Sequence, residues 1–200
     1  MMHVAAAVID RIPRPLLFAA AGLIQVALIA LMVVDRIGIL REGREVALQT
    51  RPVDPRDFLR GDYVELAYDI SSLPAGALQD RAAPGRNAPV FVKLAPAADG
   101  VFEAVSVHLE PVALGDREVL IQGRVSSGTH CGSNHRAFCD KLRVRYGIER
   151  YFVPEGEGLE IERARDKRRV TIVAAVTPSG RAAVKRLLID GQPVYREPLF

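Results

Sequence analysis

The stretch DFLRGDYVELAYDI, residues 57–70, decides the fold class. From residue 62 onward its apolar side chains recur at every second position, which is the period of a strand with one buried face. The intervening side chains would face the other way. The predicted strand therefore has a core-facing row made of Val64, Leu66, Tyr68 and Ile70.

The residues before this strand have the form of a tight turn. Asp54-Pro55 suits a helix start and Gly61 suits the end of a single helical turn, so we expect turn, glycine and strand in that order. Polar residues in such turns are usually satisfied by local backbone groups. The functional alternative is a ligand-binding site formed by Asp54, Asp57, Arg60, Asp62 and Tyr63.

The rest of the chain repeats the strand pattern. The runs VFVKLAP, VFEAVSVHLEP and REVLIQGRV are separated by AADG and ALGD, which both resemble hairpin turns. A short helix is expected in EGEGLEIERARDKR, and later turns at Ser179-Gly180 and Asp190-Gly191. About eight strands with no alternating long helices predict a mainly antiparallel β-domain.

An apolar segment precedes this domain. From Leu16 to Val34 the nineteen residues carry no charge, and they would form a helix of roughly 28 Å, close to the thickness of a bilayer's hydrocarbon core. We therefore expect one transmembrane helix. The predicted organisation is a cytoplasmic tail at 1–14, an anchor at 15–35, a stalk at 36–56 and a β-domain at 57–200.

A cleaved signal peptide is the competing interpretation, because Arg11 and Arg14 precede the apolar run. The run is longer than a typical signal-peptide core and lacks a small-x-small cleavage site, which favours an uncleaved anchor. The excess of arginine after the span argues for a cytoplasmic C-terminus, but long domains translocate largely regardless of charge. We predict a cytoplasmic N-terminus and an external domain.

Charge excludes one class of function. The net charge of +3 on 200 residues is no nucleic-acid footprint, and no nucleic-acid-binding motif accompanies it. The densest charged run, residues 160–169, mixes both signs and predicts a solvated helix face.

The turn and strand also carry a family signature. Gly61-Asp62-Tyr63, Leu66 and Tyr68 have the spacing of the GDYXXLXY family of bacterial membrane-anchored proteins, and YGIERYFVPEGEG and IDGQPV resemble its later landmarks. The resemblance implies a single-pass protein of the bacterial inner membrane with a periplasmic domain. It transfers no catalytic residue to this chain, because the family has none assigned. Because Leu66 and Tyr68 lie on the core-facing row, they suit packing better than catalysis.

A second likeness concerns type I signal peptidases, which also place a β-domain after an anchor. Their nucleophilic serine lies eight residues before a Gly-Asp pair, and this chain has Val53 there. Thr50 is the nearest hydroxyl, and Lys93 could act as a base, but a base without a nucleophile cannot form an acyl-enzyme. An inactive relative of that fold stays open.

One loop carries both cysteines, in the sequence THCGSNHRAFCD. A disulfide between Cys131 and Cys139 would contribute about 2 to 3 kcal/mol in an oxidising compartment. Free thiols are the first alternative. A metal site is the second, with the ligand set His130, Cys131, His135 and Cys139.

These observations predict a binding or scaffold module and not an enzyme. Its expected partners are the membrane and another envelope membrane protein, with no cofactor and no catalytic residue. The alternative is an envelope hydrolase with a non-serine mechanism, which would use Asp54, Asp57 and Asp62 or the PEGEG loop with Glu155 and Glu157.

Overall fold

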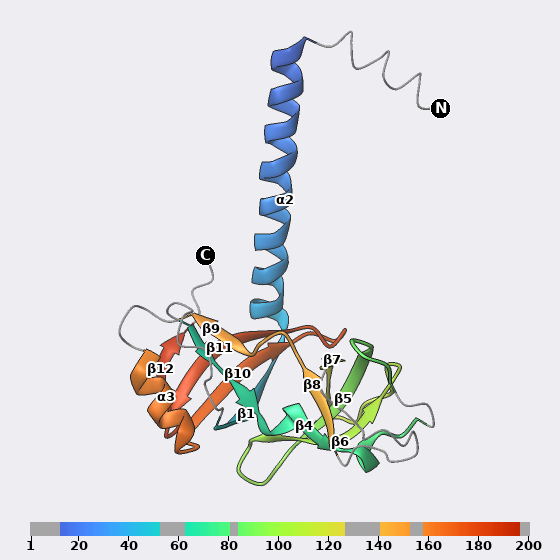
Figure 1. Cartoon of the computed structure of the whole chain (residues 1–200), viewed down its shortest axis with the longest axis vertical. Coiled ribbons are helices and arrows are strands. Elements are labelled where there is room, and N and C mark those ends of the chain that lie inside the picture. The colour runs from blue at the N-terminus through green and yellow to red at the C-terminus, as the bar shows by residue number, and fades with distance from the viewer. Residues whose placement is uncertain (1–12, 53–62, 81–83, 127–140, 153–157, 197–200) are drawn as a thin grey trace. The chain divides into compact units, whose positions relative to one another are not determined.

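The computed structural model describes residues 13–52, 63–80, 84–126, 141–152 and 158–196. Backbone contacts divide the chain after Gly38, and residues 39–199 form the compact unit that contains the strands. Figure 1 shows α2 as one continuous coil and the strands of the β-unit as arrows. The predicted fold class, an N-terminal apolar helix followed by a mainly antiparallel β-domain with a short helix, is confirmed.

Helix α2 (Arg14–Glu42) contains the apolar segment. Most of its large apolar side chains between Leu16 and Val34 are exposed and not covered by other parts of the chain that the structure describes. This exposure is expected for a helix that faces lipid on all sides. The helix is long and apolar enough to cross a membrane.

Strand β1 (Arg44–Arg51) follows α2 after the single residue Gly43. Residues 36–56 were expected to form a stalk, but β1 instead pairs from Arg44 to Gln49 with β10 (Val170–Val176). The cause is the alternation of Val46, Leu48 and Thr50, which are all fully buried.

The first sheet has the strand order β12-β11-β10-β1-β3. Both predicted late turns join neighbouring antiparallel strands here, at Ser179-Gly180 and Asp190-Gly191. The bounds of its remaining strands are Ala67–Tyr68 for β3, Ala182–Ile189 for β11 and Gln192–Arg196 for β12.

The second sheet has the strand order β4-β8-β7-β5-β6. The AADG turn joins β5 and β6 as predicted. The ALGD turn does not make a hairpin, because β6 and β7 lie on opposite sides of β5 and the loop between them must cross it. The bounds are Ser72–Pro74 for β4, Pro89–Pro96 for β5, Phe102–His108 for β6, Val119–Val125 for β7 and Lys141–Arg145 for β8.

The two large sheets share one hydrophobic core. Leu48 and Ile172 come from the first sheet, and Leu94 and Ile121 from the second. The remaining described elements are the two-stranded sheet of β2 (Tyr63–Glu65) and β9 (Arg150–Phe152), the 3-10 turns η1 (Asp69–Ser71) and η2 (Ala75–Ala77), and the helix α3 (Gly158–Asp166).

Candidate functional site

The segment 63–74 connects all three sheets within twelve residues. Its first part, β2, pairs with β9, and its middle part, β3, pairs with β1 of the first sheet. Its last part, β4, pairs with β8 of the second sheet. The single strand predicted from the sequence is therefore divided, because each part finds a different neighbour.

A partner segment, residues 141–152, runs antiparallel beside it. The two segments pair at both ends, with Glu65 opposite Arg150 and Ser72 opposite Arg143. Six residues separate these paired blocks on each segment, so the register is the same at both ends. The six residues between these blocks on one segment are not paired in a β-ladder with the six on the other segment. Other contacts join the two segments there.

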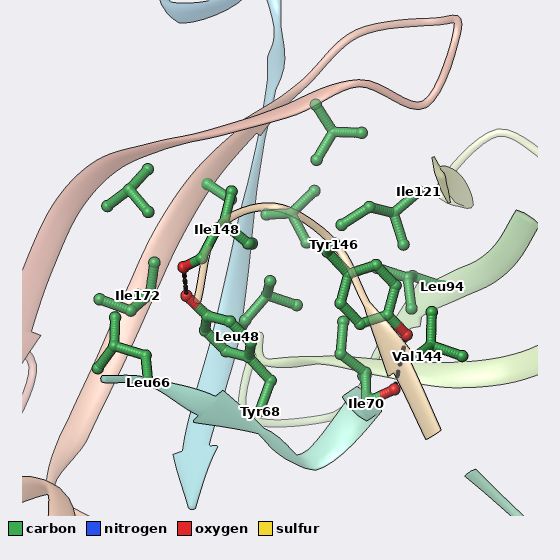
Figure 2. Close-up of a cluster of buried hydrophobic side chains, with 14 of the residues drawn as sticks. Leu48, Leu66, Tyr68, Ile70, Leu94, Ile121, Val144, Tyr146, Ile148 and Ile172 are labelled. Atoms are coloured by element: carbon green, nitrogen blue, oxygen red, sulfur yellow. Dashed lines mark hydrogen bonds between the residues drawn. The ribbon is translucent and has the colours of Figure 1, made fainter. Parts of the chain in front are cut away.

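Two tyrosines join the segments in this central region (Figure 2). The Tyr68 hydroxyl donates to the carbonyl oxygen of Ile148 at 2.6 Å, and the Tyr146 hydroxyl donates to the carbonyl oxygen of Ile70 at 2.6 Å. Each segment thus supplies one tyrosine and one carbonyl acceptor to the other. We call these two reciprocal contacts the tyrosine latch.

The loop 146–149 positions the second half of the latch. Gly147 has a φ of 81°, a left-handed conformation that glycine adopts without strain. The Glu149 carboxylate accepts the backbone N–H groups of Tyr146 and Gly147, and the Glu149 carbonyl accepts the Leu66 N–H at 2.7 Å. Each residue of the YGIE sequence therefore has a structural task in holding the two segments together.

Gly123 of β7 provides the room for Tyr146. A Cβ atom at this position would lie 2.3 Å from Cγ1 of Val144, 2.9 Å from the Arg145 carbonyl oxygen and 3.1 Å from Cδ1 of Tyr146. Such distances are far below van der Waals contact. A side chain at residue 123 would therefore displace the partner segment.

The latch is dry. Tyr68 has no exposed surface and Tyr146 is buried, and this burial raises the pKa of both hydroxyls well above the ordinary tyrosine value, with a smaller contribution from the Glu149 charge. Both hydroxyls stay protonated at neutral pH and act as hydrogen-bond donors. Neither is poised to accept a proton from a substrate.

A buried arginine ties α3 to the same segment. Arg165 is only 1% exposed, and its guanidinium donates to the Glu65 carbonyl oxygen at 2.6 Å and to the Asp166 carboxylate at 2.9 Å. The sequence predicted a solvated charged face for this helix, and that prediction is wrong for Arg165. The burial of Arg165 could not be predicted from the charge pattern, because the neighbouring arginines on the helix look the same in the sequence.

Only part of the family motif lies within the residues that the structure describes, and this part begins at Tyr63. Val64, Leu66, Tyr68 and Ile70 are buried, as the period-two pattern predicted. The backbone of Tyr63 begins β2. The other motif and binding candidates lie outside the described residues: Asp54, Asp57, Arg60, Gly61 and Asp62.

The cysteine loop and the PEGEG loop also lie outside the described residues, with His130, Cys131, His135, Cys139, Glu155 and Glu157. Among the residues that the structure does describe, no group of three histidine, cysteine or carboxylate side chains is placed to hold a metal ion. The disulfide, thiol and metal alternatives therefore stay predictions.

The positions of Thr50 and Lys93 do not support the likeness to type I signal peptidases. The Thr50 hydroxyl is fully buried and donates to the Val170 carbonyl at 2.7 Å. The Lys93 ammonium lies 3.1 Å from the Glu118 carboxylate, whose pKa is lowered first by the Gly115 N–H and then by Lys93. Both groups already have partners within the fold.

Sequence reasoning missed one further contact. The Ser106 hydroxyl lies 2.8 Å from Nε2 of His108 on β6, and Lys93 of β5 is directly opposite Ser106 in the register. Alternation along β6 could have predicted this shared face. Ser106 lies on β6, the edge strand of the second sheet, but only 7% of its surface is exposed. The contact is best understood as a satisfied polar pair.

The fold and the latch define a class of protein. It has a β-domain that follows an apolar helix able to span a membrane, and two tyrosine hydrogen bonds join the two segments that connect its sheets. The family model described as GDYXXLXY protein matches residues 25–187, and the chain belongs to this family. No match was found among curated proteins or among solved structures.

Proposed function

We propose that this protein is a binding or scaffold module of the bacterial envelope. Its N-terminal tail, residues 1–14, lies in the cytoplasm, its anchor, residues 15–35, crosses the inner membrane, and its β-domain lies in the periplasm. Its partner is another membrane protein of the envelope. It acts by holding that partner and not by turning over a substrate.

The observation that carries this proposal is that the C-terminal half of the motif is buried in the domain. Leu66 and Tyr68 are buried, and the Tyr68 hydroxyl is committed to a backbone carbonyl. This half builds the domain, which leaves recognition to the residues before β2 and to Tyr63 at its start. We therefore assign partner binding to Asp54, Asp57, Arg60, Asp62 and Tyr63.

A periplasmic location also favours a disulfide between Cys131 and Cys139, because disulfides persist in oxidising compartments. Alkylation of the denatured protein with and without prior reduction measures this directly. Two blocked thiols that become reactive after reduction support both the bridge and the location. Two thiols that react without reduction contradict the bridge.

Topology is tested by fusing alkaline phosphatase, which is active only in the periplasm, to the C-terminus of the full chain. High phosphatase activity is the expected result. Activity restricted to a cytoplasmic reporter at the same position would reverse the orientation, and release of the chain from membranes by alkaline carbonate would remove the anchor from the proposal.

Partner binding is tested by chemical crosslinking in native membranes, followed by purification of the full chain. We expect a specific membrane protein to be recovered with the wild-type chain and lost with Asp57→Asn, Arg60→Gln and Asp62→Asn. The matched control replaces exposed charges elsewhere on the β-domain, Arg86→Gln and Glu103→Gln, and should keep the partner. Equal recovery with both sets would overturn the assigned binding residues.

A further inference from the structure

Helix α2 carries a single polar side chain within its uncharged segment. Gln25 is the central residue of the nineteen from Leu16 to Val34, so a membrane-spanning helix would place it near the bilayer midplane. Its side chain is exposed and has no hydrogen-bond partner in the part of the chain that the structure describes. In hydrocarbon no water can satisfy this amide, so a partner from another helix would be stabilising.

Gly22 lies on the same face of the helix as Gln25, three residues earlier. A Cβ atom at Gly22 would have no atom within 4 Å, so nothing in the chain's own fold requires glycine at this position. Glycine in a helix allows the backbone of a second helix to approach closely. The open position and the unsatisfied amide thus mark one face of α2 by two separate observations.

We propose that the face of α2 defined by Gly22 and Gln25 packs against the same face of a second copy of this chain in the membrane. The proposal rests on the membrane anchoring proposed above. It adds to that function a specific self-association through the anchor, which would present two β-domains to the partner together.

The amide chemistry of Gln25 favours a second copy of this chain, and not an unrelated helix, as the partner of this face. Copies of one chain insert with the same orientation, so identical residues lie at the same depth in a parallel pair. An amide carries both donors and acceptors, and two Gln25 side chains can therefore satisfy each other across a two-fold axis. A different protein would need its own polar group at this depth.

The test uses the full chain in vesicles of phosphatidylethanolamine and phosphatidylglycerol. Copies labelled with donor or acceptor fluorophores at the C-terminus are mixed, and energy transfer is measured while the protein is diluted with lipid. We expect Gln25→Leu and Gly22→Leu each to weaken association by about 3- to 30-fold. Gln25→Asn, which keeps an amide, should retain more of the association than Gln25→Leu.

Two controls isolate the face. Ala27→Leu adds the same kind of bulk on the opposite side of the helix and should leave energy transfer unchanged. The exchange Gln25→Leu with Leu23→Gln keeps the composition but moves the amide to the opposite side, away from Gly22, and should weaken association as Gln25→Leu does.

The outcomes separate this inference from the proposed function. Extraction of the wild-type chain by alkaline carbonate would remove the anchoring itself. Retention in the membrane with no energy transfer at any density, or transfer that is insensitive to both Gln25→Leu and Gly22→Leu, would overturn the self-association alone. Gln25-dependent recovery of a different membrane protein by single copies of the chain would also overturn it.

Discussion

The tyrosine latch and the Glu45 cluster both join separate segments through polar side chains, but in opposite surroundings. The latch joins neighbouring segments, whereas the Glu45 cluster joins β1 to β11, which lie on either side of β10. The latch uses two buried neutral hydroxyls on backbone carbonyls. The Glu45 cluster uses an exposed carboxylate that pairs with Lys185, at 3.0 Å, and with Arg186. Because water competes for the second and not for the first, the less conspicuous tyrosines should contribute more stability than the charges.

The largest effect is expected from Tyr68→Ala. Removing this ring leaves a cavity between the two sheets and an unsatisfied Ile148 carbonyl, which should lower the free energy of unfolding by about 3 to 5 kcal/mol. Urea unfolding of the full chain in mild detergent, followed by circular dichroism, measures the change. The control is Leu114→Ala on an exposed loop, with an expected loss below about 0.5 kcal/mol. Equal losses would contradict the central role of the latch.

The next largest effect is expected from Asp166→Ala. The Asp166 side chain is half exposed, yet its removal leaves the buried Arg165 guanidinium without a counter-charge, and the expected loss is about 3 kcal/mol. Arg165→Met should cost less, because Asp166 can then return to water while an apolar side chain fills the space. The same unfolding measurement decides between them, and a smaller loss for Asp166→Ala than for Arg165→Met would contradict the buried-charge interpretation.

The latch also predicts alkaline sensitivity. The raised pKa of Tyr68 and Tyr146 means that the folded chain retains two protons that the unfolded chain releases. Their contribution is fully present below about pH 10, the unfolded tyrosine value, and is lost as pH rises toward the folded pKa, by up to about 1.4 kcal/mol per tyrosine per pH unit. The double variant Tyr68→Phe with Tyr146→Phe should show a flatter alkaline limb. An unchanged limb would assign the sensitivity to other groups.

The single variants Tyr68→Phe and Tyr146→Phe test the hydrogen bonds without removing the rings. Each should lower the free energy of unfolding by about 1 to 2 kcal/mol, because a buried carbonyl loses its donor. Both bonds hold the same two segments, so the double variant should lose less than the sum of the single losses. Strict additivity would show that the two contacts act independently.

The sequence predicted the parts of this region that depend on local pattern. Alternation in Val64 to Ile70 was sufficient to identify the buried row, and the apolar run was sufficient to identify α2. The latch joins residues 80 and 76 positions apart, and no local pattern specifies such a pairing. The same limit explains the ALGD loop, because a turn-like sequence does not say whether another strand will lie between the two that it connects.

Strand β1 shows a different limit. Its buried positions alternate correctly, but it directly follows a long helix and includes a buried threonine among its apolar residues. Thr50 is tolerated because its hydroxyl donates to the Val170 carbonyl, a partner that only the folded pairing supplies. The sequence therefore suggested a stalk where the fold has an interior strand of the first sheet.

The smallest effect is expected from Glu45→Gln. The Lys185 hydrogen bond is the main cause that lowers the pKa of Glu45, with the Arg186 charge adding to it, so the contribution is present above the ordinary glutamate value and is lost as pH falls toward the lower folded pKa. Solvent screening limits it to about 0.5 kcal/mol at neutral pH, and added salt should reduce it further. Unfolding of wild type and Glu45→Gln at neutral and acidic pH, with and without salt, measures this difference. A loss that matches Tyr68→Phe and resists salt would mean that the exposed cluster, and not only the buried latch, holds the first sheet together.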